Sequence, residues 1–248
     1  MKAHRPPTAT LAAKTPGSGR RRGGESLNSS FHESFRGNGA SPLLVAIVGG
    51  SGAGKTWLAE KLRNALSPDA TLLALDDFYR DRSHLSADRR AKLNFDHPNA
   101  IDWPCFETVL RACRAGRTVR VPQYDFSTHR RRPDWRAFQP KPIILVEGLW
   151  LLRRKSLRRL FDWRIYVEAP TALRLRRRLL RDQKQRGRTP ASVRTQFRQT
   201  VQPMHQRFVA PQARWANVVV RGTAKPPAIR ALLNQLRQAR IPAVSIPD

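Results

Sequence analysis

A glycine-rich loop between a strand and a helix constrains the fold of this chain more than any other feature. Residues 49–56 read GGSGAGKT and satisfy the pattern G-x-x-x-x-G-K-[ST]. An apolar run over 43–48 precedes the loop, and an amphipathic pattern over 55–66 follows it. Glycines allow positive φ angles that turn backbone N–H groups inward, at the positive end of the following helix. The loop therefore predicts a binding site for the phosphates of a nucleotide.

The loop and one acid downstream of it supply candidate ligands for phosphate and metal. The loop consists of Gly49, Gly50, Ser51, Gly52, Ala53, Gly54, Lys55 and Thr56. We expect Lys55 to contact the β- and γ-phosphates and Thr56 to bind Mg²⁺. Glu147 ends a second apolar run. Because ligands bind beyond the carboxyl ends of parallel strands, Glu147 is expected to face the loop as a further metal ligand. The alternatives are a chance glycine-rich turn and an acid that caps the next segment.

Short β-rich runs alternate with longer helical patterns from Pro42 onward. This alternation predicts an α/β fold with a mainly parallel sheet flanked by helices. We expect strands over 43–48, 71–75, 143–146, 164–167 and 217–220. We expect helices over 55–66, 106–115, 171–185, 191–206 and 225–240. The stretch 81–139 is interrupted by prolines among aromatic and charged residues, so it is expected to leave the sheet and build a substrate site.

Composition limits the classes of partner. The chain carries 47 basic and 18 acidic side chains and a formal charge of +29, which favours an anionic partner. Residues 1–40 have no hydrophobic periodicity and are expected to form a disordered basic tail, with a transit peptide as the alternative. No apolar run approaches the length of a membrane-spanning helix. The two cysteines, Cys105 and Cys113, form no Cys-x-x-Cys motif, which argues against a disulfide framework or structural zinc and favours the cytoplasm.

Three clusters of polar and aromatic residues follow the glycine-rich loop. They read DDFY over 76–79, NFDHP over 94–98 and YDFSTHR over 124–130. With these clusters the chain resembles the uridine-cytidine kinases, within the wider P-loop family that includes phosphoribulokinase and type I pantothenate kinase. The resemblance extends from about Val45 to Arg221. It implies a P-loop kinase fold and a nucleoside kinase domain over 41–248, which transfers phosphate from ATP to the 5′-hydroxyl of uridine or cytidine with Mg²⁺, a step of pyrimidine salvage.

The resemblance also implies roles for single residues of the acceptor site. Asp76 meets the 5′-hydroxyl, where a carboxylate can accept the proton and aim the oxygen at the γ-phosphorus, although the neighbouring Asp77 complicates the assignment. Asp96 contacts the ribose hydroxyls and favours ribose over deoxyribose. Tyr124, Phe126 and His129 match residues around the pyrimidine, with Phe95 as a further wall, and Tyr79 is a further expected substrate-binding residue. From the residues alone, other interpretations remain open: Asp96 as a turn-forming loop residue, the aromatic residues as part of the core, and His129 as a surface residue.

Arginines dominate the chain between Thr171 and Arg188. They are Arg174, Arg176, Arg177, Arg178, Arg181, Arg186 and Arg188. The resemblance implies an Arg-rich lid in which Arg178 lies toward the ribose and Arg181 takes part in catalysis beside Lys55. It also implies that Arg186 and Arg188 bind the ATP phosphates and that Gln196 contacts the substrate. For Arg174, Arg176 and Arg177, the alternative interpretation is a basic helix face that is exposed to solvent.

Two other functions stay open. The first is a P-loop kinase of another small alcohol, such as ribulose phosphate, pantothenate or glycerate, and the cluster 124–129 argues against it. The second is a nucleic-acid-binding ATPase that uses the positive charge, although the chain has no recognised RNA-binding signature. We therefore expect nucleic acid to bind only non-specifically, if at all, and the excess of arginine also fits a composition bias. The resemblance implies a homo-oligomer, and we expect no membrane partner.

Overall fold

The computed structural model describes residues 41–222 and 224–240. Contacts divide the chain into two units, Met1–Gly39 and Ala40–Asp248, and all described residues belong to the second. The predicted tail, residues 1–40, therefore lies outside the described residues. No helix of the described part of the chain is long and apolar enough to cross a membrane.

A five-stranded sheet lies at the centre of the described unit, and all of its neighbouring strands are parallel. Its order is β2-β7-β1-β8-β9, formed by β1 (Leu43–Gly49), β2 (Ala70–Ala74), β7 (Ile143–Gly148), β8 (Trp163–Glu168) and β9 (Val218–Arg221). Each strand lies within two residues of its predicted range. Every residue of β1 and of β7 is buried, as expected for strands covered on both faces. The predicted α/β class is confirmed.

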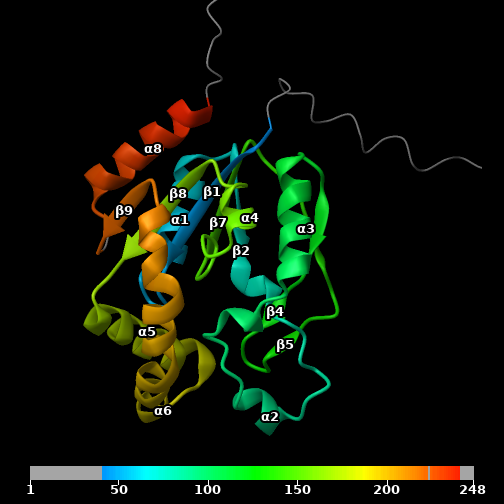
Figure 1. The fold of residues 1–248 in the computed structure, drawn as a ribbon, viewed down its shortest axis with the longest axis vertical. Coiled ribbons are helices and arrows are strands. Elements are labelled where there is room, and N and C mark those ends of the chain that lie inside the picture. The colour runs from blue at the N-terminus through cyan, green and yellow to red at the C-terminus, as the bar shows by residue number, and fades with distance from the viewer. Residues whose placement is uncertain (1–40, 223, 241–248) are drawn as a thin grey trace, which may run out of the picture. The chain divides into compact units, whose positions relative to one another are not determined.

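Helices cover both faces of this sheet (Figure 1). Val45 and Ile47 pack with α1 (Lys55–Ala65) and α8 (Pro226–Arg240). Leu44 and Ala46 pack on the other face with α3 (Trp103–Arg114), α4 (Lys155–Arg158) and the end of the helical segment 190–215. Because successive side chains of a strand point to opposite faces, β1 contributes to two separate cores. Both cysteines are free thiols, and Cys113 is buried in the α3 core.

Helix α3 begins three residues before its predicted start. The Asp102 side chain accepts a hydrogen bond from the Cys105 N–H at 3.3 Å, and Pro104 lies in the first turn. Proline is tolerated there because the first N–H groups of a helix have no intrahelical partner. The predicted range therefore began too late because Pro104 was assigned to the loop rather than to the helix start.

The chain from Pro190 to Trp215 is helical over more residues than predicted. It runs as α6 (Pro190–Gln196), a π-helical turn (Phe197–Val201), α7 (Gln202–Met204), a second π-helical turn (His205–Val209) and a 3-10 turn (Ala210–Trp215). Pro203 and Pro211 lie at the starts of the third and fifth pieces. Proline has no N–H for the α-helical ladder, which explains why the pattern of hydrogen bonds changes rather than continuing.

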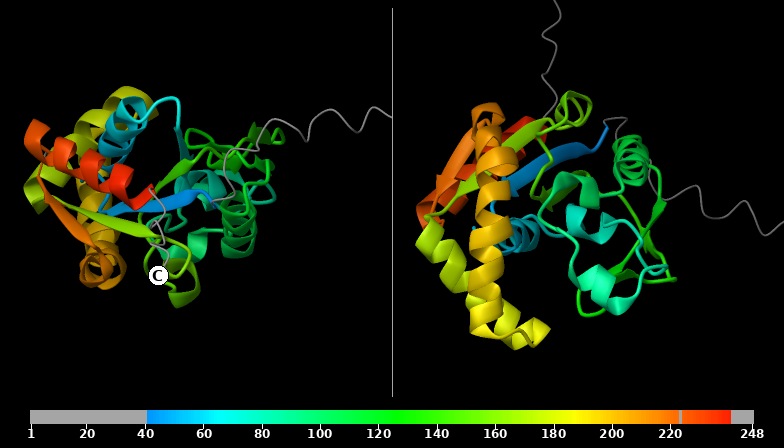
Figure 2. Two further views of the ribbon diagram at one scale, coloured as in Figure 1. Left: turned by 90° about the horizontal axis from the view of Figure 1, so that it is seen from above. Right: turned by 60° about the horizontal axis from the view of Figure 1, so that its bottom comes forward.

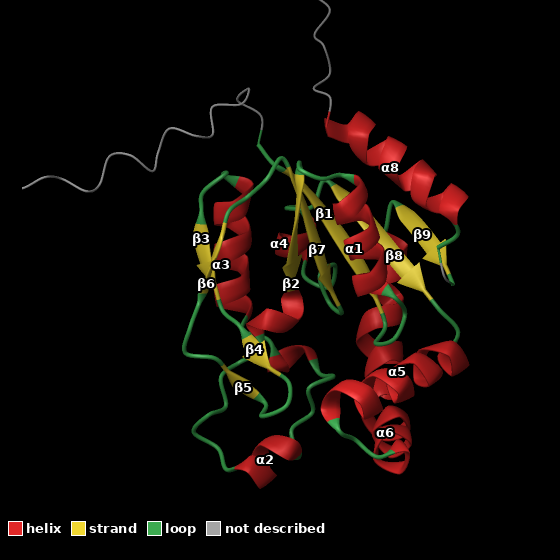
Figure 3. Ribbon diagram, turned by 180° about the vertical axis from the view of Figure 1, so that it is seen from behind, coloured by secondary structure: helices red, strands yellow, loops and turns green. Residues whose placement is uncertain are grey.

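The stretch 81–139 leaves the main sheet, as predicted, but contains structure of its own. It holds α2 (Ala87–Ala91), α3 and two antiparallel ladders, β3 (Val119–Val121) with β6 (Arg136–Phe138) and β4 (Tyr124–Asp125) with β5 (Arg130–Arg131). Figure 3 shows these ladders beside α3 and near α2, apart from the main sheet. Strands of two or three residues are too short to give a period-two pattern, so the sequence analysis did not predict them.

Candidate active site

The glycine-rich loop connects β1 to α1 at the carboxyl edge of the sheet. Gly52 and Gly54 have φ angles of 77° and 105°, in the left-handed region. Gly52 also faces helix α5 (Thr171–Arg186) so closely that a Cβ would lie 2.4 Å from the carbonyl oxygen of Arg174. Lys55 is buried, and its Nζ donates to the Gly50 carbonyl at 3.4 Å. The loop therefore has the curled backbone that a phosphate cradle requires.

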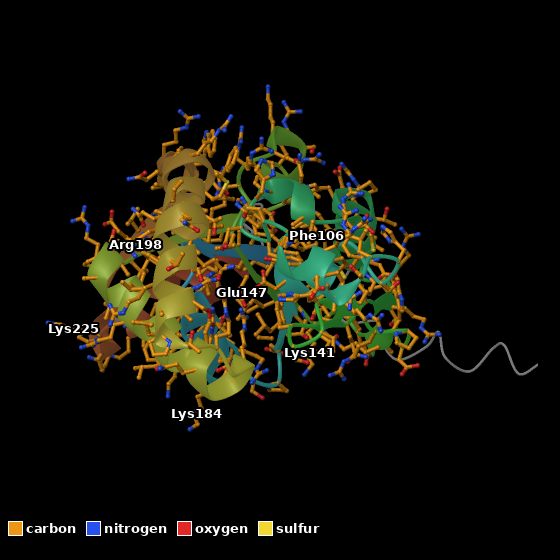
Figure 4. All side chains as sticks on the ribbon, turned by 90° about the horizontal axis from the view of Figure 1, so that it is seen from below. Phe106, Lys141, Glu147, Lys184, Arg198 and Lys225 are labelled. Carbon is orange, nitrogen blue, oxygen red and sulfur yellow. The ribbon has the colours of Figure 1, made fainter. Side chains whose placement is uncertain are left out.

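Thr56 and Glu147 meet beneath this loop. The Thr56 hydroxyl donates to Glu147 Oε1 at 2.9 Å, although the residues come from α1 and β7. Burial raises the pKa of Glu147, and the neighbouring Lys55 ammonium opposes that rise. Figure 4 shows Glu147 near the centre of the view from below, whereas Lys184 of α5 lies at the edge. The two side chains expected to bind a metal therefore lie side by side, with Glu147 buried and Thr56 exposed.

Asp76 lies on a 3-10 turn (Leu75–Phe78) that directly follows β2. Its Oδ1 atom is buried and has no hydrogen-bond partner among the described residues. The adjacent Asp77 is different, because Arg136 lies 3.4 Å from its Oδ2. Burial raises the pKa of Asp77, while Arg136 lowers it. Of the two neighbouring carboxylates, Asp76 is the one that lines a cavity with Lys55.

Aromatic side chains form a further part of the lining of that cavity. The rings of Phe95 and His129 stack with centroids 4.4 Å apart and an interplanar angle of 12°. Tyr79 lies 5.0 Å from Tyr124 and 6.2 Å from Phe126, measured between ring centroids. The Tyr79 hydroxyl donates to the Phe95 carbonyl at 3.0 Å, which fixes both rings. Tyr79 and Tyr124 belong to the main core, Phe95 and Phe126 pack against it, and all four also line the cavity.

His129 has an unusual backbone and an unpaired nitrogen. Its φ is 54°, the one positive value among the described non-glycine residues, and its Nδ1 is buried without a hydrogen-bond partner. Burial lowers the pKa of His129, and the nearby Arg186 and Arg188 lower it too. The imidazole is therefore neutral near pH 7, with one nitrogen able to donate and the other able to accept.

Asp96 and Arg178 form a buried pair on the other side of the cavity. Asp96 is 9% exposed and lies 3.7 Å from Arg178, measured from Oδ1 to Nη1. Burial raises the pKa of Asp96, and the Arg178 guanidinium opposes the rise. Arg178 also donates to Ser51 Oγ at 2.9 Å and to Gln196 Oε1 at 2.8 Å. One guanidinium thus connects the glycine-rich loop, the carboxylate Asp96 and helix α6.

The cavity has a volume of about 370 Å³ and brings together most of the residues predicted for the site. Its lining comes from the glycine-rich loop, the stretch after β2, the excursion 81–139, the end of β7 and the segment 178–196. In the right-hand view of Figure 2, helices α5 and α6 lie on one side and helix α2 of the excursion lies on the other. The predicted residues in the lining are Ser51, Lys55, Thr56, Asp76, Tyr79, Phe95, Asp96, Tyr124, Phe126, His129, Glu147, Arg178, Arg181, Arg186, Arg188 and Gln196. Ser127 and Leu149 complete it. We refer to this space as the acceptor cavity.

The interpretation of Arg174 and Arg177 as a solvated face is wrong. Arg174 is 1% exposed, donates to Gln202 Oε1 at 2.6 Å and lies over the Phe197 ring. Arg177 donates to the Ala53 carbonyl at 2.9 Å and so contacts the glycine-rich loop directly. No local sequence pattern shows that the loop itself packs against this helix.

A second, largely apolar cavity of about 230 Å³ opens beside the loop, and the sequence analysis missed it. It is lined by Ala53, Gly54, Trp57, Leu58, Val167, Arg177, Val220, Gly222 and Ala224. Trp57 is 40% exposed, which is unusual for so large an apolar side chain and was the one available signal. The other residues come from distant strands, so only the fold brings them together. We refer to this space as the donor cavity.

A parallel sheet with a phosphate-binding loop at its carboxyl edge, next to a cavity that holds an unpaired carboxylate and converging arginines, defines a P-loop kinase. The chain belongs to the Phosphoribulokinase / Uridine kinase family, whose model matches residues 44–225. This family uses ATP as the phosphate donor.

Comparison with individual proteins agrees with this assignment. The chain is 41% identical over 182 residues to a uridine kinase of Staphylococcus haemolyticus (strain JCSC1435), covering 73% of this chain and 88% of that protein. It is 37% identical over 199 residues to a uridine kinase of Clostridium novyi (strain NT), covering 79% and 96%. The fold is similar to a putative fructose transport system kinase from Silicibacter sp. TM1040, with a TM-score of 0.61, 22% identity, and 75% and 92% of the two chains covered. It is also similar to phosphoribulokinase from Rhodobacter spheroides, with a TM-score of 0.56, 20% identity and coverage of 73% and 70%.

Proposed function

We propose that this protein transfers the γ-phosphate of ATP to the 5′-hydroxyl of uridine or cytidine. The observation that carries the proposal is the acceptor cavity, which combines an unpartnered carboxylate, Asp76, with an aromatic end that suits a flat base. The similarity to proteins named uridine kinase supports the same acceptor. Other members of the family act on different alcohols, so the acceptor is the part of the proposal that needs a direct test.

Asp76 acts on the acceptor hydroxyl in this proposal. A carboxylate without a competing hydrogen-bond donor can accept the hydroxyl proton and hold the oxygen in line with the γ-phosphorus. Lys55 lines the same cavity, where its ammonium would neutralise charge on the β- and γ-phosphates. Asp77 takes no part, because it lies beside Arg136 outside the lining.

Asp96 and His129 account for selectivity. The Asp96 carboxylate has enough lone pairs to accept from both hydroxyls of a ribose, and its burial penalises an acceptor that lacks one of them. The neutral imidazole of His129 lies beside the ring of Phe95, where a pyrimidine could stack. Since either imidazole nitrogen can carry the proton, the site suits the carbonyl of uracil as well as the amine of cytosine.

Thr56 and Glu147 would hold Mg²⁺ together with the phosphates of ATP. The set consists of one hydroxyl and one carboxylate, in keeping with an ion that retains water and binds substrate oxygens. No group of three or more His, Cys, Asp or Glu side chains suited to a metal occurs in the described residues. When bound, the ion would neutralise charge on the transferring phosphate. Thr56 and Glu147 need little movement to bind it, because they already lie 2.9 Å apart.

The donor cavity would hold the base of the nucleotide. It begins at Ala53 and Gly54, where the phosphate-binding loop ends, and Trp57 and Arg177 offer planar groups for stacking. The lid arginines, Arg178, Arg181, Arg186 and Arg188, line the acceptor cavity instead. The proposed reaction therefore takes place between the two cavities, at the glycine-rich loop.

The proposal is tested by measuring ADP release from Mg-ATP with uridine, cytidine, deoxyuridine, adenosine, pantothenate and ribulose 5-phosphate. We expect turnover with the two pyrimidine ribonucleosides only. Asp76→Asn is expected to lower kcat by about 10²- to 10⁴-fold, whereas Asp77→Asn, a matched change one residue away, retains kcat within about threefold. Turnover of pantothenate or ribulose 5-phosphate instead would refute the pyrimidine assignment, and equal losses in the two variants would refute the role of Asp76.

A further inference from the structure

Asp182, near the end of α5, is buried at the centre of the lid arginines. Its side chain has no exposed surface, and it does not line the acceptor cavity. The shortest ion pairs join its Oδ1 to Arg181 Nη2 at 2.9 Å and its Oδ2 to Arg178 Nε at 3.3 Å. Arg186 and Arg188 follow at 3.7 and 3.9 Å. A single carboxylate thus lies within 4 Å of all four arginines.

The backbone of Asp182 contributes to the same arrangement. Its carbonyl accepts hydrogen bonds from the N–H groups of Gly187 and Arg188, the latter at 3.1 Å. Gly187 has a φ of 61°, the left-handed conformation that ends a helix and turns the chain back. This turn brings Arg186 and Arg188 back toward the side-chain carboxylate of Asp182, the same residue whose backbone carbonyl accepts the last hydrogen bonds of the helix.

The balance of charge around Asp182 is uneven. Four guanidinium groups share one carboxylate, and among the described residues no other acid lies within 4 Å of Arg181, Arg186 or Arg188. Burial lowers the pKa of Arg186, the positive charge of Arg181 lowers it further, and Asp182 opposes both. Without this carboxylate, like charges would separate the arginines that line the cavity.

We propose that Asp182 is a positioning residue that holds the lid arginines converged on the acceptor cavity before phosphate arrives. This inference rests on the proposed function, because only that function supplies the phosphate groups that the arginines would bind. Guanidinium groups that are already in place stabilise the charge that develops during phosphate transfer, because no free energy is needed to reorganise them at that step. Asp182 itself touches neither substrate, so it acts only through the four side chains that it orients.

Steady-state kinetics of Asp182→Asn test the proposal. Asparagine keeps the size of the side chain but removes the charge, so we expect kcat to fall by about 10- to 100-fold. We expect the KM for the nucleoside to change by less than about threefold, because Asp96 and the aromatic residues remain in place. Asp182→Glu is expected to recover a large part of kcat, since it restores a carboxylate. Glu107→Gln, which removes the carboxylate of an exposed helical pair with Arg111, is the matched control with unchanged kcat.

A second measurement needs no acceptor. Trypsin cleaves after arginine where the backbone opens locally, so the rate of cleavage at residues 181–188 of the folded protein reports how firmly this segment is held. We expect faster cleavage there in Asp182→Asn than in the wild type or Glu107→Gln, with thermal midpoints measured alongside. Unchanged lid cleavage and unchanged kcat would overturn the proposal, as would a loss of kcat that only follows the unfolded fraction. If the wild type phosphorylates no pyrimidine nucleoside, the proposed function fails, while the cleavage rates still decide the role of Asp182.

Discussion

Four carboxylates, three of them buried and that of Asp76 half-buried, differ in the partners that they contact, and this difference separates their roles. Glu147 accepts a hydrogen bond from a hydroxyl, whereas Asp96 and Asp182 lie beside arginines. Asp76 Oδ1 is the exception, because it is buried and has no partner. An unpaired buried acceptor is costly for folding. Its presence in the cavity that Lys55 also lines therefore fits a group whose partner is the substrate.

The charge state of His205 gives a prediction for the dependence of stability on pH. Burial, followed by the positive charges of Arg174 and Lys55, lowers the pKa of His205 to about 4. The unfolded chain takes up this proton near pH 6.5, so between these values the unfolded state binds more protons than the folded state. The free energy of unfolding should therefore decrease as the pH falls from about 6.5 toward 4.

Thermal midpoints measured across this range check the prediction. His205→Gln is expected to flatten the decrease, whereas His84→Gln, at an exposed position, is expected to leave it unchanged. An identical slope in all three proteins would show that other groups cause the loss of stability in acid.

At the level of elements, the contact between α5 and the glycine-rich loop determines the geometry of the site. The Arg177 guanidinium donates to the carbonyl of Ala53, and the carbonyl of Arg174 faces Gly52. The helix that carries the lid arginines is therefore packed directly on the loop expected to bind phosphate. A shift of either element would change the distance between the two sets of groups.

Gly52→Ala is expected to disturb this contact. The new Cβ would lie 2.4 Å from the Arg174 carbonyl oxygen, so α5 and the loop must move apart, in addition to a strain of about 1–2 kcal/mol for a side chain at positive φ. Gly116→Ala is the matched control, because its φ is 70° but nothing lies within 4 Å of a Cβ there. Urea denaturation and the KM for ATP should show a larger loss for Gly52→Ala. Equal losses of stability and of ATP binding in the two variants would mean that the contact between the new Cβ and the Arg174 carbonyl has no effect of its own.

The buried side chain of Gln212 connects the helical segment 190–215 to the loop after β7. Its Oε1 accepts from the Leu152 N–H, and its Nε2 donates to the Leu149 and Phe208 carbonyls, each at 2.8 Å. Gln212→Leu leaves buried backbone groups unpaired, so we expect a loss of about 2–4 kcal/mol in the free energy of unfolding. Gln206→Leu, at an exposed position of the same segment, should cost less than about 0.5 kcal/mol. Denaturant titrations of both variants measure the difference.

The parts of the fold that could be predicted are those encoded locally. The strands of the main sheet, the loop 49–56 and helix α5 each carry a pattern within a few residues. The donor cavity could not be predicted in this way, because Trp57 and Ala224 meet only after α1 and the chain beyond β9 have packed. Asp182 was missed for a related reason, since a single acid among arginines looks like a surface residue until its burial is known.

The positive charge of the whole chain is only partly compensated within the fold. Residues 41–248 contain 40 of the 47 basic and 16 of the 18 acidic side chains, so most of the excess lies outside the predicted tail. Several arginines pack on aromatic rings rather than on acids, including Arg158 and Arg214 at 3.9 and 4.2 Å from the centre of the Trp215 ring. Such a surface repels itself at low ionic strength.

We therefore expect salt to stabilise this protein. Raising NaCl from about 50 to about 500 mM shortens the screening length, so the thermal midpoint should rise by a few degrees. Potassium sulfate at equal ionic strength is the comparison, because a larger effect of sulfate would indicate anion binding, or exclusion of sulfate from the protein surface, in addition to screening. A midpoint that decreases with NaCl would show that attractive ion pairs outweigh the repulsion.

The described chain begins and ends on the same side of the sheet. Figure 1 shows the start of β1 and the end of α8 at the top, whereas α5, α6 and α2 lie at the bottom with the carboxyl ends of the central strands. A fusion partner or surface linker joined beyond either element would therefore attach on the side away from the acceptor cavity. An attachment made directly before β1 or directly after α8 should thus preserve substrate access.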